Sequence, residues 1–298
     1  MHIDKISEKG NEMAYTKHTE RLWQLVQEKG FLIAAHRGTN GGNVIQNTTL
    51  AYKNALLQGA DIIELDLIMS TDKQFFAFHN GQEPLVLHQN FDIRTKTARE
   101  ILQYGCYNDN NHISTQHLEL VGDILETFRG KCIFNIDRSW FYWKETLEFL
   151  ASFGMEDQLI IKSPVQPSLL KTLQESGNQI MYMPIITSYE QLGQVMEYDV
   201  NFVAAELIFD NTTSPLQSKQ LLSDLRGRGI ATWVNAITLD DETTLCANLD
   251  DNRSIREDFS LGWGGLIDRG FTMIQTDWPG LLYRYRSERT KFPFGNGK

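Results

Sequence analysis

The chain has 298 residues, of which 38 are acidic and 28 are basic, so its formal net charge is −10 at pH 7. This acidic balance argues against a general nucleic-acid binder and against a polybasic membrane anchor, because both need a surplus of Lys and Arg. Hydrophobic residues make up 41% and charged residues 22% of the chain, which is typical of a soluble globular protein that can bury a substantial core.

Residues 1–30 are expected to form a helical extension ahead of the main domain. Within them, 19–28 carries four apolar side chains at helical spacing, typical of a helix that covers one end of a domain. The first fifteen residues have no apolar stretch like that of a signal peptide, and no apolar run in the chain reaches the length of a membrane span. We therefore expect a cytoplasmic protein without a stable membrane anchor.

Short β-rich runs and helical patterns alternate along the rest of the chain. The β-rich runs are 31–35, 61–68, 74–79, 131–136, 158–161, 180–184, 201–205, 229–234 and 272–276. The helical patterns cover 48–57, 139–153, 167–176, 189–197 and 215–228. This order predicts βαβ units and a parallel sheet, and eight such units in one domain predict a (β/α)8 barrel over residues 31–298. The charged stretch 238–268 is expected to be a helical or looped insertion in that domain.

The second and third β-rich runs are too close in sequence for a crossover helix between them. They are therefore expected to form an antiparallel hairpin. A two-residue loop at Thr71-Asp72 would pair Ser70 with Lys73, and this register would place Glu64 opposite His79.

Polar residues end several of the predicted strands, where the active sites of such barrels are built. His36 and Arg37 follow the first run, and His79 ends the third. A histidine can transfer protons near neutral pH and an arginine can hold an anion, although each alone is as compatible with an ordinary surface or core residue. Further candidates for binding a phosphate or substrate hydroxyls are Lys162, Glu206 and Asn235.

Two carboxylates on the second run are expected to share one face. Glu64 and Asp66 alternate along the strand, and they would repel each other unless a cation or an arginine neutralised them. Asp137 ends the fourth run and is either a third ligand or a helix N-cap. Oxygen ligands suit Mg²⁺ or Ca²⁺, and the three dispersed cysteines indicate neither a zinc site nor a disulfide framework.

Taken together, these runs resemble the glycerophosphodiester phosphodiesterase family in the order and spacing of their motifs. The family has a strand ending in His-Arg-Gly, an Asn-Thr loop, an alanine-rich helix, Gly-Ala-Asp, a Glu-x-Asp strand, a Thr-x-Asp turn, a strand-end His, Asn-Ile-Glu and Thr-Asp-x-Pro. The matching residues are His36-Arg37-Gly38, Asn47-Thr48, Thr49–Gln58, Gly59-Ala60-Asp61, Glu64 and Asp66, Thr71-Asp72, His79, Asn135-Ile136-Asp137 and Thr276-Asp277-Trp278-Pro279.

The resemblance implies a (β/α)8 barrel that hydrolyses glycerophosphodiesters to glycerol 3-phosphate and an alcohol, through a cyclic phosphate, with one divalent cation. Carried over by motif, His36 and His79 take the acid/base positions, with His36 slightly favoured as the first base, and Arg37 takes the phosphate position. The metal positions fall on Glu64, Asp66 and Asp137.

Three departures from the family pattern leave the substrate open. Gln46 stands in place of a loop glutamate, Asn80 in place of an aspartate, and Ser139 in place of a lysine. One alternative is a related phospholipase C/D-like phosphodiesterase or lyase that acts on a lysophospholipid or a phosphoinositide. Another is a barrel that binds phosphoesters with weak or no catalysis. The leaving alcohol, the choice between Mg²⁺ and Ca²⁺, and the oligomeric state stay open.

Overall fold

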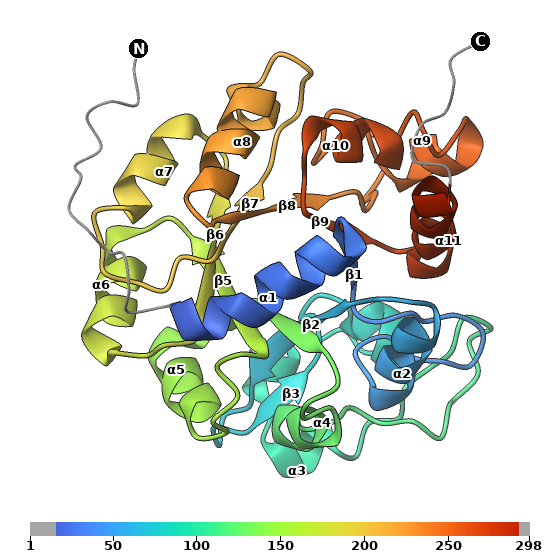
Figure 1. The fold of residues 1–298 in the computed structure, drawn as a ribbon. Helices are drawn as coiled ribbons and strands as arrows, with labels where there is room; N and C mark the ends of the chain where they lie inside the picture. Colours follow the sequence, from blue (N-terminus) through green and yellow to red (C-terminus); the bar gives the residue numbers. More distant parts are fainter. Residues whose placement is uncertain (1–15, 292–298) are drawn as a thin grey trace.

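Eight parallel strands close into a barrel in the computed structural model, which describes residues 16–291 (Figure 1). Apart from β3 (Phe75–Ala77), which pairs antiparallel with β2 outside the ring, the strands in sequence order are β1 (Leu32–Ala35), β2 (Ile62–Met69), β4 (Ile133–Asp137), β5 (Leu159–Pro164), β6 (Met181–Ile186), β7 (Ala204–Leu207), β8 (Ala231–Asn235) and β9 (Met273–Thr276). Their hydrogen-bonded order is β1-β9-β8-β7-β6-β5-β4-β2, and a parallel β1–β2 pairing closes the ring. The predicted (β/α)8 barrel is confirmed.

Helices surround the ring of strands and follow most of them in the chain (Figure 1). The helices are α1 (Thr16–Lys29), α2 (Thr49–Leu57), α3 (Ala98–Ile101), α4 (Val121–Thr127), α5 (Trp143–Ala151), α6 (Pro167–Ser176), α7 (Tyr189–Val195), α8 (Lys219–Gly227), α9 (Asp251–Arg256), α10 (Trp263–Arg269) and α11 (Pro279–Lys291). All five helical patterns of the barrel domain are present, and α5 and α8 are each preceded by a short 3₁₀ turn. In the described part of the chain, none of these helices has both the length and the apolar character needed to cross a bilayer.

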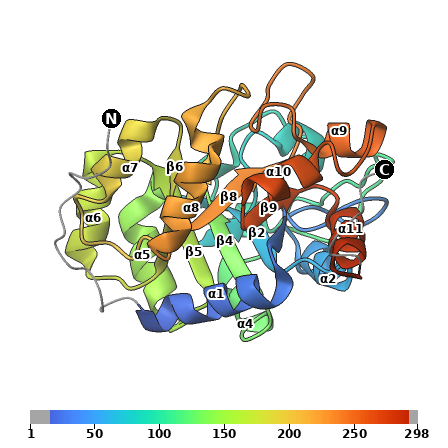
Figure 2. The same cartoon turned by 45° about the horizontal axis from the view of Figure 1, so that its top comes forward.

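The amino-terminal end of the barrel is covered by α1, as expected for 19–28 (Figure 2). Leu22 and Val26 are buried there in one apolar cluster with Leu32, Trp233 and Met273, which come from the strands. Burying a leucine and a valine side chain typically contributes about 1.5–3 kcal/mol each. The helix thus seals one end of the barrel, which leaves the carboxyl ends of the strands as the open end.

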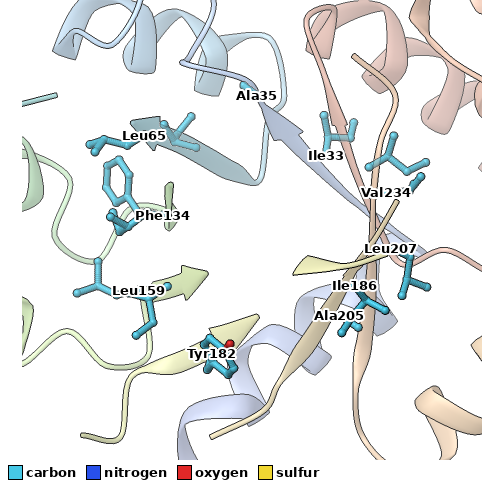
Figure 3. Close-up of a cluster of buried hydrophobic side chains, with 14 of the residues drawn as sticks. Ile33, Ala35, Leu65, Phe134, Leu159, Tyr182, Ile186, Ala205, Leu207 and Val234 are labelled. Carbon is cyan, nitrogen blue, oxygen red and sulfur yellow. The ribbon is translucent and has the colours of Figure 1, made fainter. Parts of the chain in front are cut away.

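Alternation along β2 places its acidic side chains. Leu65 belongs to the apolar layer between strands and helices (Figure 3), and so do Ile63 and Leu67. The alternate residue Ile62 packs instead with the barrel interior. Because successive side chains on a strand point to opposite faces, Glu64 and Asp66 share the interior side with Ile62.

The strand β3 pairs antiparallel with the outer end of β2, as predicted, but the predicted register is wrong. Met69 lies opposite Phe75, so the turn contains one residue more than expected, and Glu64 is not opposite His79. Lys73 takes a left-handed conformation with φ 62°, and its N–H donates to Ser70 O over 3.0 Å. A three-residue loop with such a residue is a common alternative to a two-residue turn.

Two long connections add structure outside the ring of strands. The segment between β3 and α4 has its own small apolar core, which includes Val86, Ile93 and Leu118. The connection between β8 and β9 carries α9 and α10, and it contains the stretch 238–268 that was expected to be an insertion. The division into an extension over 1–30 and one barrel domain stays a prediction, and residues 1–15 lie outside the described part.

Candidate active site

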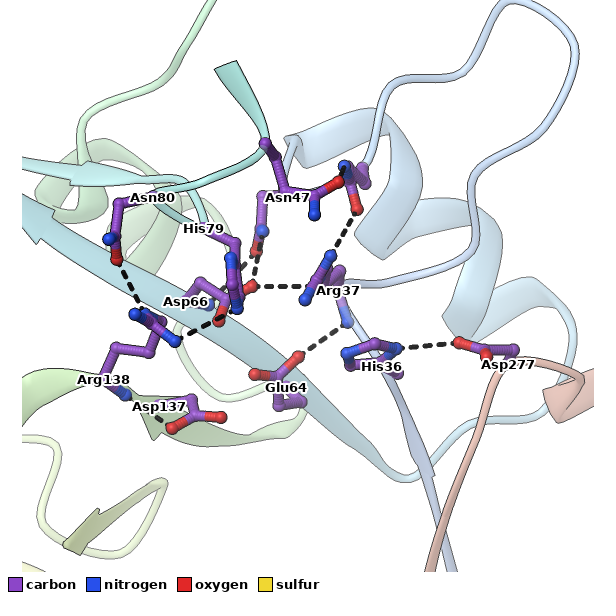
Figure 4. A network of polar contacts seen from close by, with 12 residues as sticks. His36, Arg37, Asn47, Glu64, Asp66, His79, Asn80, Asp137, Arg138 and Asp277 are labelled. Atoms are coloured by element: carbon purple, nitrogen blue, oxygen red, sulfur yellow. Dashed lines mark hydrogen bonds and ion pairs between the residues drawn. The ribbon is translucent and has the colours of Figure 1, made fainter. Parts of the chain in front are cut away.

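Three carboxylates meet at the open end of the barrel. Glu64 and Asp66 come from β2, and Asp137 ends the neighbouring strand β4 with its Cα directly opposite that of Asp66. One oxygen from each of the three carboxylates lies within 4.8 Å of the others. Glu64 and Asp66 are buried, whereas the Asp137 side chain keeps 21% of its surface exposed. Figure 4 shows the three side chains together. The structure therefore brings the expected metal ligands into one cluster.

The electrostatics of this cluster fit a divalent cation. Burial raises the pKa of Glu64, and the charges of Asp66 and Asp137 raise it further. Glu64 Oε2 accepts a hydrogen bond from the Arg37 N–H over 2.8 Å, but Oε1 is buried without a hydrogen-bond partner. A buried oxygen without a partner destabilises the folded protein. A set of ligands that are all oxygens suits Mg²⁺ or Ca²⁺. The three carboxylates thus have the chemistry of a site for a hard cation.

Arg37 lies against the acidic cluster from the end of β1. Its Nε is 3.0 Å from Asp66 Oδ2, although the contact lacks hydrogen-bond geometry, and its Nη1 donates to Gln46 Oε1 over 3.2 Å. Asn47 Nδ2 donates to Asp66 Oδ2 over 2.9 Å. Gln46 therefore adds a neutral oxygen beside Arg37 where the family has a carboxylate.

Lys162 pairs with two carboxylates of the site and offsets part of their negative charge. Its Nζ lies 3.0 Å from Asp137 Oδ2 and 3.2 Å from Glu206 Oε2, and the side chain is buried. Burial alone would lower the pKa of Lys162, but the charges of Asp137, Glu206 and Glu64 raise it. Burial raises the pKa of Asp137, but Lys162, together with the backbone N–H and the charge of Arg138, holds it below its usual value.

Glu206 and Asn235, expected to meet substrate hydroxyls, are buried and bonded to each other. Asn235 Nδ2 donates to Glu206 Oε1 over 2.7 Å, and Trp233 Nε1 donates to Asn235 Oδ1 over 2.7 Å. Their polar atoms thus contact other groups of the protein. Together with Lys162, the two residues form a buried layer next to the acidic cluster. Their role in binding substrate stays a prediction.

His36 is held by a carboxylate from the far end of the chain. Its Nδ1 lies 2.8 Å from Asp277 Oδ1, and Figure 4 shows this pair on the side of Glu64 away from Asp66. The Asp277 N–H donates to Asp251 Oδ2 over 2.9 Å. Asp251 is buried, and its Oδ1 also accepts from Trp263 Nε1 and Thr276 Oγ1. The connection between β8 and β9 therefore anchors the residue that orients His36.

His79 lies beside Asp66 and is covered by an arginine (Figure 4). Arg138 Nη1 is 3.1 Å from His79 Nε2, and Arg138 Nε donates to Asn80 Oδ1 over 2.9 Å. His79 Nδ1 is buried without a hydrogen-bond partner. Burial lowers the pKa of His79; Asp66 opposes this effect, and Arg37 and Arg138 add to the lowering.

Sequence reasoning did not assign roles to Asp277, Asp251, Asn47 or Arg138. Asp277, Asn47 and Arg138 contact predicted site residues, and Asp251 contacts Asp277. Asp277 was visible as part of the Thr-Asp-x-Pro motif. The position of Arg138 depends on a left-handed backbone at φ 58°, which no sequence pattern indicates. Ser139, which stands where the family has a lysine, is buried and donates to Lys162 O over 3.4 Å.

Comparisons with known proteins show what the sequence of this chain resembles. A family model described as a domain of unknown function matches residues 182–286. A curated glycerophosphodiester phosphodiesterase of Bacillus altitudinis is 26% identical over an alignment of 141 residues, and the match covers 44% of this chain and 57% of that protein. The chain thus spans just over half the length of this relative.

Solved structures show the same fold at low sequence identity. A glycerophosphoryl diester phosphodiesterase from Parabacteroides distasonis has a TM-score of 0.72 and 16% identity, with 87% of this chain and 86% of that chain covered. A phosphodiesterase from Oleispira antarctica, solved in complex with the product sn-glycerol-3-phosphate, has a TM-score of 0.58 and 15% identity, with 86% and 96% covered. The predicted resemblance to this family is confirmed.

Proposed function

We propose that this chain, which has the fold of the solved glycerophosphodiester phosphodiesterases, hydrolyses glycerophosphodiesters to glycerol 3-phosphate and an alcohol with the help of a divalent cation. The observation that carries the proposal is the cluster of Glu64, Asp66 and Asp137, whose oxygens lie within 4.8 Å of one another at the open end of the barrel. Figure 4 shows His36, Arg37 and His79 around this cluster, an arrangement that supports phosphodiester chemistry.

The proposed binding roles follow from charge. Glu64, Asp66 and Asp137 hold the cation, which, when bound, neutralises developing negative charge on the phosphoryl oxygens. Arg37 binds a phosphoryl oxygen through guanidinium nitrogens not used by Gln46. Lys162, which lies between Asp137 and Glu206, lowers the pKa of Asp137 and so helps to keep that carboxylate ionised.

The two histidines carry the proposed proton transfers. Burial and the nearby arginines lower the pKa of His79, which favours a neutral imidazole that takes the proton of the attacking glycerol hydroxyl. His36 is held through Nδ1 by Asp277, so its Nε2 is the nitrogen that protonates the leaving oxygen. These roles reverse the slight preference for His36 as the first base. Opening of the cyclic phosphate by water exchanges the two roles.

A substrate panel tests the proposal. Glycerophosphodiesters with different alcohols are assayed after treatment with EDTA and again with Mg²⁺ or Ca²⁺ restored, and the products are identified by ³¹P NMR. We expect turnover only with added metal and glycerol 3-phosphate as the final product. His36→Ala and His79→Ala should each lose about 10²–10⁴-fold in kcat, with circular dichroism showing that the fold persists.

Other outcomes would support one of the alternative functions or change the proposed roles of the histidines. Binding of the diesters without turnover under any condition would support a barrel that has lost catalysis. A cyclic phosphate as the final product, or turnover of lysophospholipids alone, would support the related phospholipase-like reaction. Full activity of either alanine variant would remove that histidine from the mechanism.

A further inference from the structure

Arg138 is a cation beside the candidate active site whose guanidinium forms no ion pair with a carboxylate in the described part of the chain, although its backbone N–H donates to Asp137 Oδ1 and its charge lowers the pKa of Asp137. Among the described residues, no Asp or Glu oxygen lies within 4.0 Å of its guanidinium, whereas Arg37 contacts Asp66 and Lys162 contacts both Asp137 and Glu206. The partners of its guanidinium are the amide oxygen of Asn80 and the imidazole of His79, both of which are neutral acceptors.

The same contact closes access to His79. Arg138 Nη1 lies 3.1 Å from His79 Nε2, and His79 Nδ1 is buried. A proton can reach the ring from a substrate only through a nitrogen that the substrate can approach. In this arrangement neither nitrogen meets that condition, so His79 can act only after the guanidinium leaves Nε2.

An anion offers Arg138 a better partner than those it has. A guanidinium and a phosphate attract each other as opposite charges and often form two parallel hydrogen bonds, whereas Asn80 and His79 offer Arg138 only uncharged acceptors. The guanidinium stands over the Phe141 ring at 5.2 Å, and Phe141 is half exposed. The ring supports the arginine and leaves it beside the open end of the barrel, where a phosphodiester would bind.

We propose that Arg138 is a further catalytic residue, which covers His79 Nε2 at rest and moves to a phosphoryl oxygen of the substrate, so that substrate binding itself uncovers the base. The inference rests on the proposed function, and it adds a phosphate-binding arginine from the end of β4 to Arg37 from the end of β1. Asn80 keeps the resting contact weak, because its amide carries no charge.

Phosphate binding and the state of His79 provide a test that does not depend on turnover. Inorganic phosphate and sn-glycerol 3-phosphate are titrated at fixed Mg²⁺ while calorimetry measures affinity and ¹⁵N NMR follows the His79 ring, assigned with His79→Gln. In the wild type, phosphate should shift the Nε2 signal of His79. In Arg138→Gln, this signal should already be shifted before phosphate is added, and the affinity should fall about 10-fold or more, the size expected for one charge-assisted hydrogen bond.

Three variants sharpen the comparison. Arg94→Gln is the matched control, because Arg94 stands over the same Phe141 ring at 5.9 Å but is paired with Asp92; it should bind phosphate as the wild type does. Arg138→Lys should restore part of the affinity. Asn80→Asp gives Arg138 a charged partner, so it should hold the arginine on its resting contact and raise KM more than it lowers kcat.

The inference and the proposed function can fail separately. If Arg138→Gln binds phosphate as tightly as the wild type, or if phosphate leaves the His79 signals of the wild type unchanged, the inference is wrong whatever the activity. If phosphate shifts His79 through Arg138 but no glycerophosphodiester is turned over, the binding role stands and the proposed hydrolysis is wrong.

Discussion

Asp277 Oδ1 lies 2.8 Å from His36 Nδ1, although the two residues are 241 positions apart in the sequence. The carboxylate can only accept, so the contact places the ring proton on Nδ1 and leaves Nε2 with its lone pair or a second proton. The pair joins the first and last strands of the barrel, which are neighbours in the ring through the β1–β9 pairing. Orientation of His36 therefore depends on how the barrel closes.

Removing this carboxylate should lower kcat more than it raises KM. In Asp277→Asn the amide can present its NH₂ to Nδ1 and favour the wrong tautomer, so we expect a loss of at least about tenfold in kcat. Steady-state kinetics on a glycerophosphodiester measures the effect. Asp268→Asn, which alters an exposed carboxylate paired with Arg289, should behave as the wild type. Equal kcat in Asp277→Asn would show that His36 needs no such partner.

Asp251 should make stability depend on pH. Burial, followed by the charge of Asp277, raises the pKa of Asp251 to about 8 from its usual 3.8. The folded protein then keeps a proton that the unfolded chain releases near pH 4, so this residue's contribution to the free energy of unfolding decreases as the pH rises from about 4 to about 8. Asp251→Asn cannot ionise and should show a flatter pH dependence in urea unfolding. Parallel curves for the two proteins would contradict the shifted pKa.

Lys162 should be important for stability because the buried Glu206 and the partly buried Asp137 both face it. Lys162→Met leaves Asp137 and Glu206 without their shared cation, and loss of one partner from a buried ion pair costs about 3–5 kcal/mol. Guanidinium unfolding measures the change. The double variant Lys162→Met/Glu206→Gln should recover part of the loss. The control Lys171→Met removes an exposed lysine paired with Glu175 and should change little, because exposed pairs contribute little.

Gly38 should not tolerate a side chain. Its φ is +77°, and a Cβ there would come within 2.8 Å of the Ala51 backbone carbon and of the Tyr52 ring. Gly38→Ala should therefore strain the backbone and displace α2. Together the two effects should lower the free energy of unfolding by more than about 2 kcal/mol. Gly130→Ala is the control, because Gly130 has φ +76° with no atom within 4 Å of the added Cβ. Similar melting temperatures for the two variants would show that Ala51 and Tyr52 can move away from the added Cβ with little loss of stability.

The sequence was enough to predict the barrel and the acidic cluster, because both depend on local patterns. Alternation alone placed Glu64 and Asp66 on one side of their strand. Strand-end position left Asp137 as either a third ligand or a helix N-cap, and the family resemblance implied the ligand role. The hairpin register was wrong by one residue because Lys73 adopts a left-handed conformation that a sequence without a turn glycine does not indicate. The contact of Arg138 with His79 could not be predicted. It depends on the left-handed backbone of Arg138 and joins residues that follow two different strands.

The covering helix α1 has a consequence for shortened forms of the protein. Leu22 and Val26 lie on apolar strand residues at the barrel's amino-terminal end. A version that begins at β1 would expose these apolar strand residues to water, and the molecules should associate through them. Trimming the chain to its barrel would thus yield aggregates whose loss of activity says nothing about the chemistry at the opposite end.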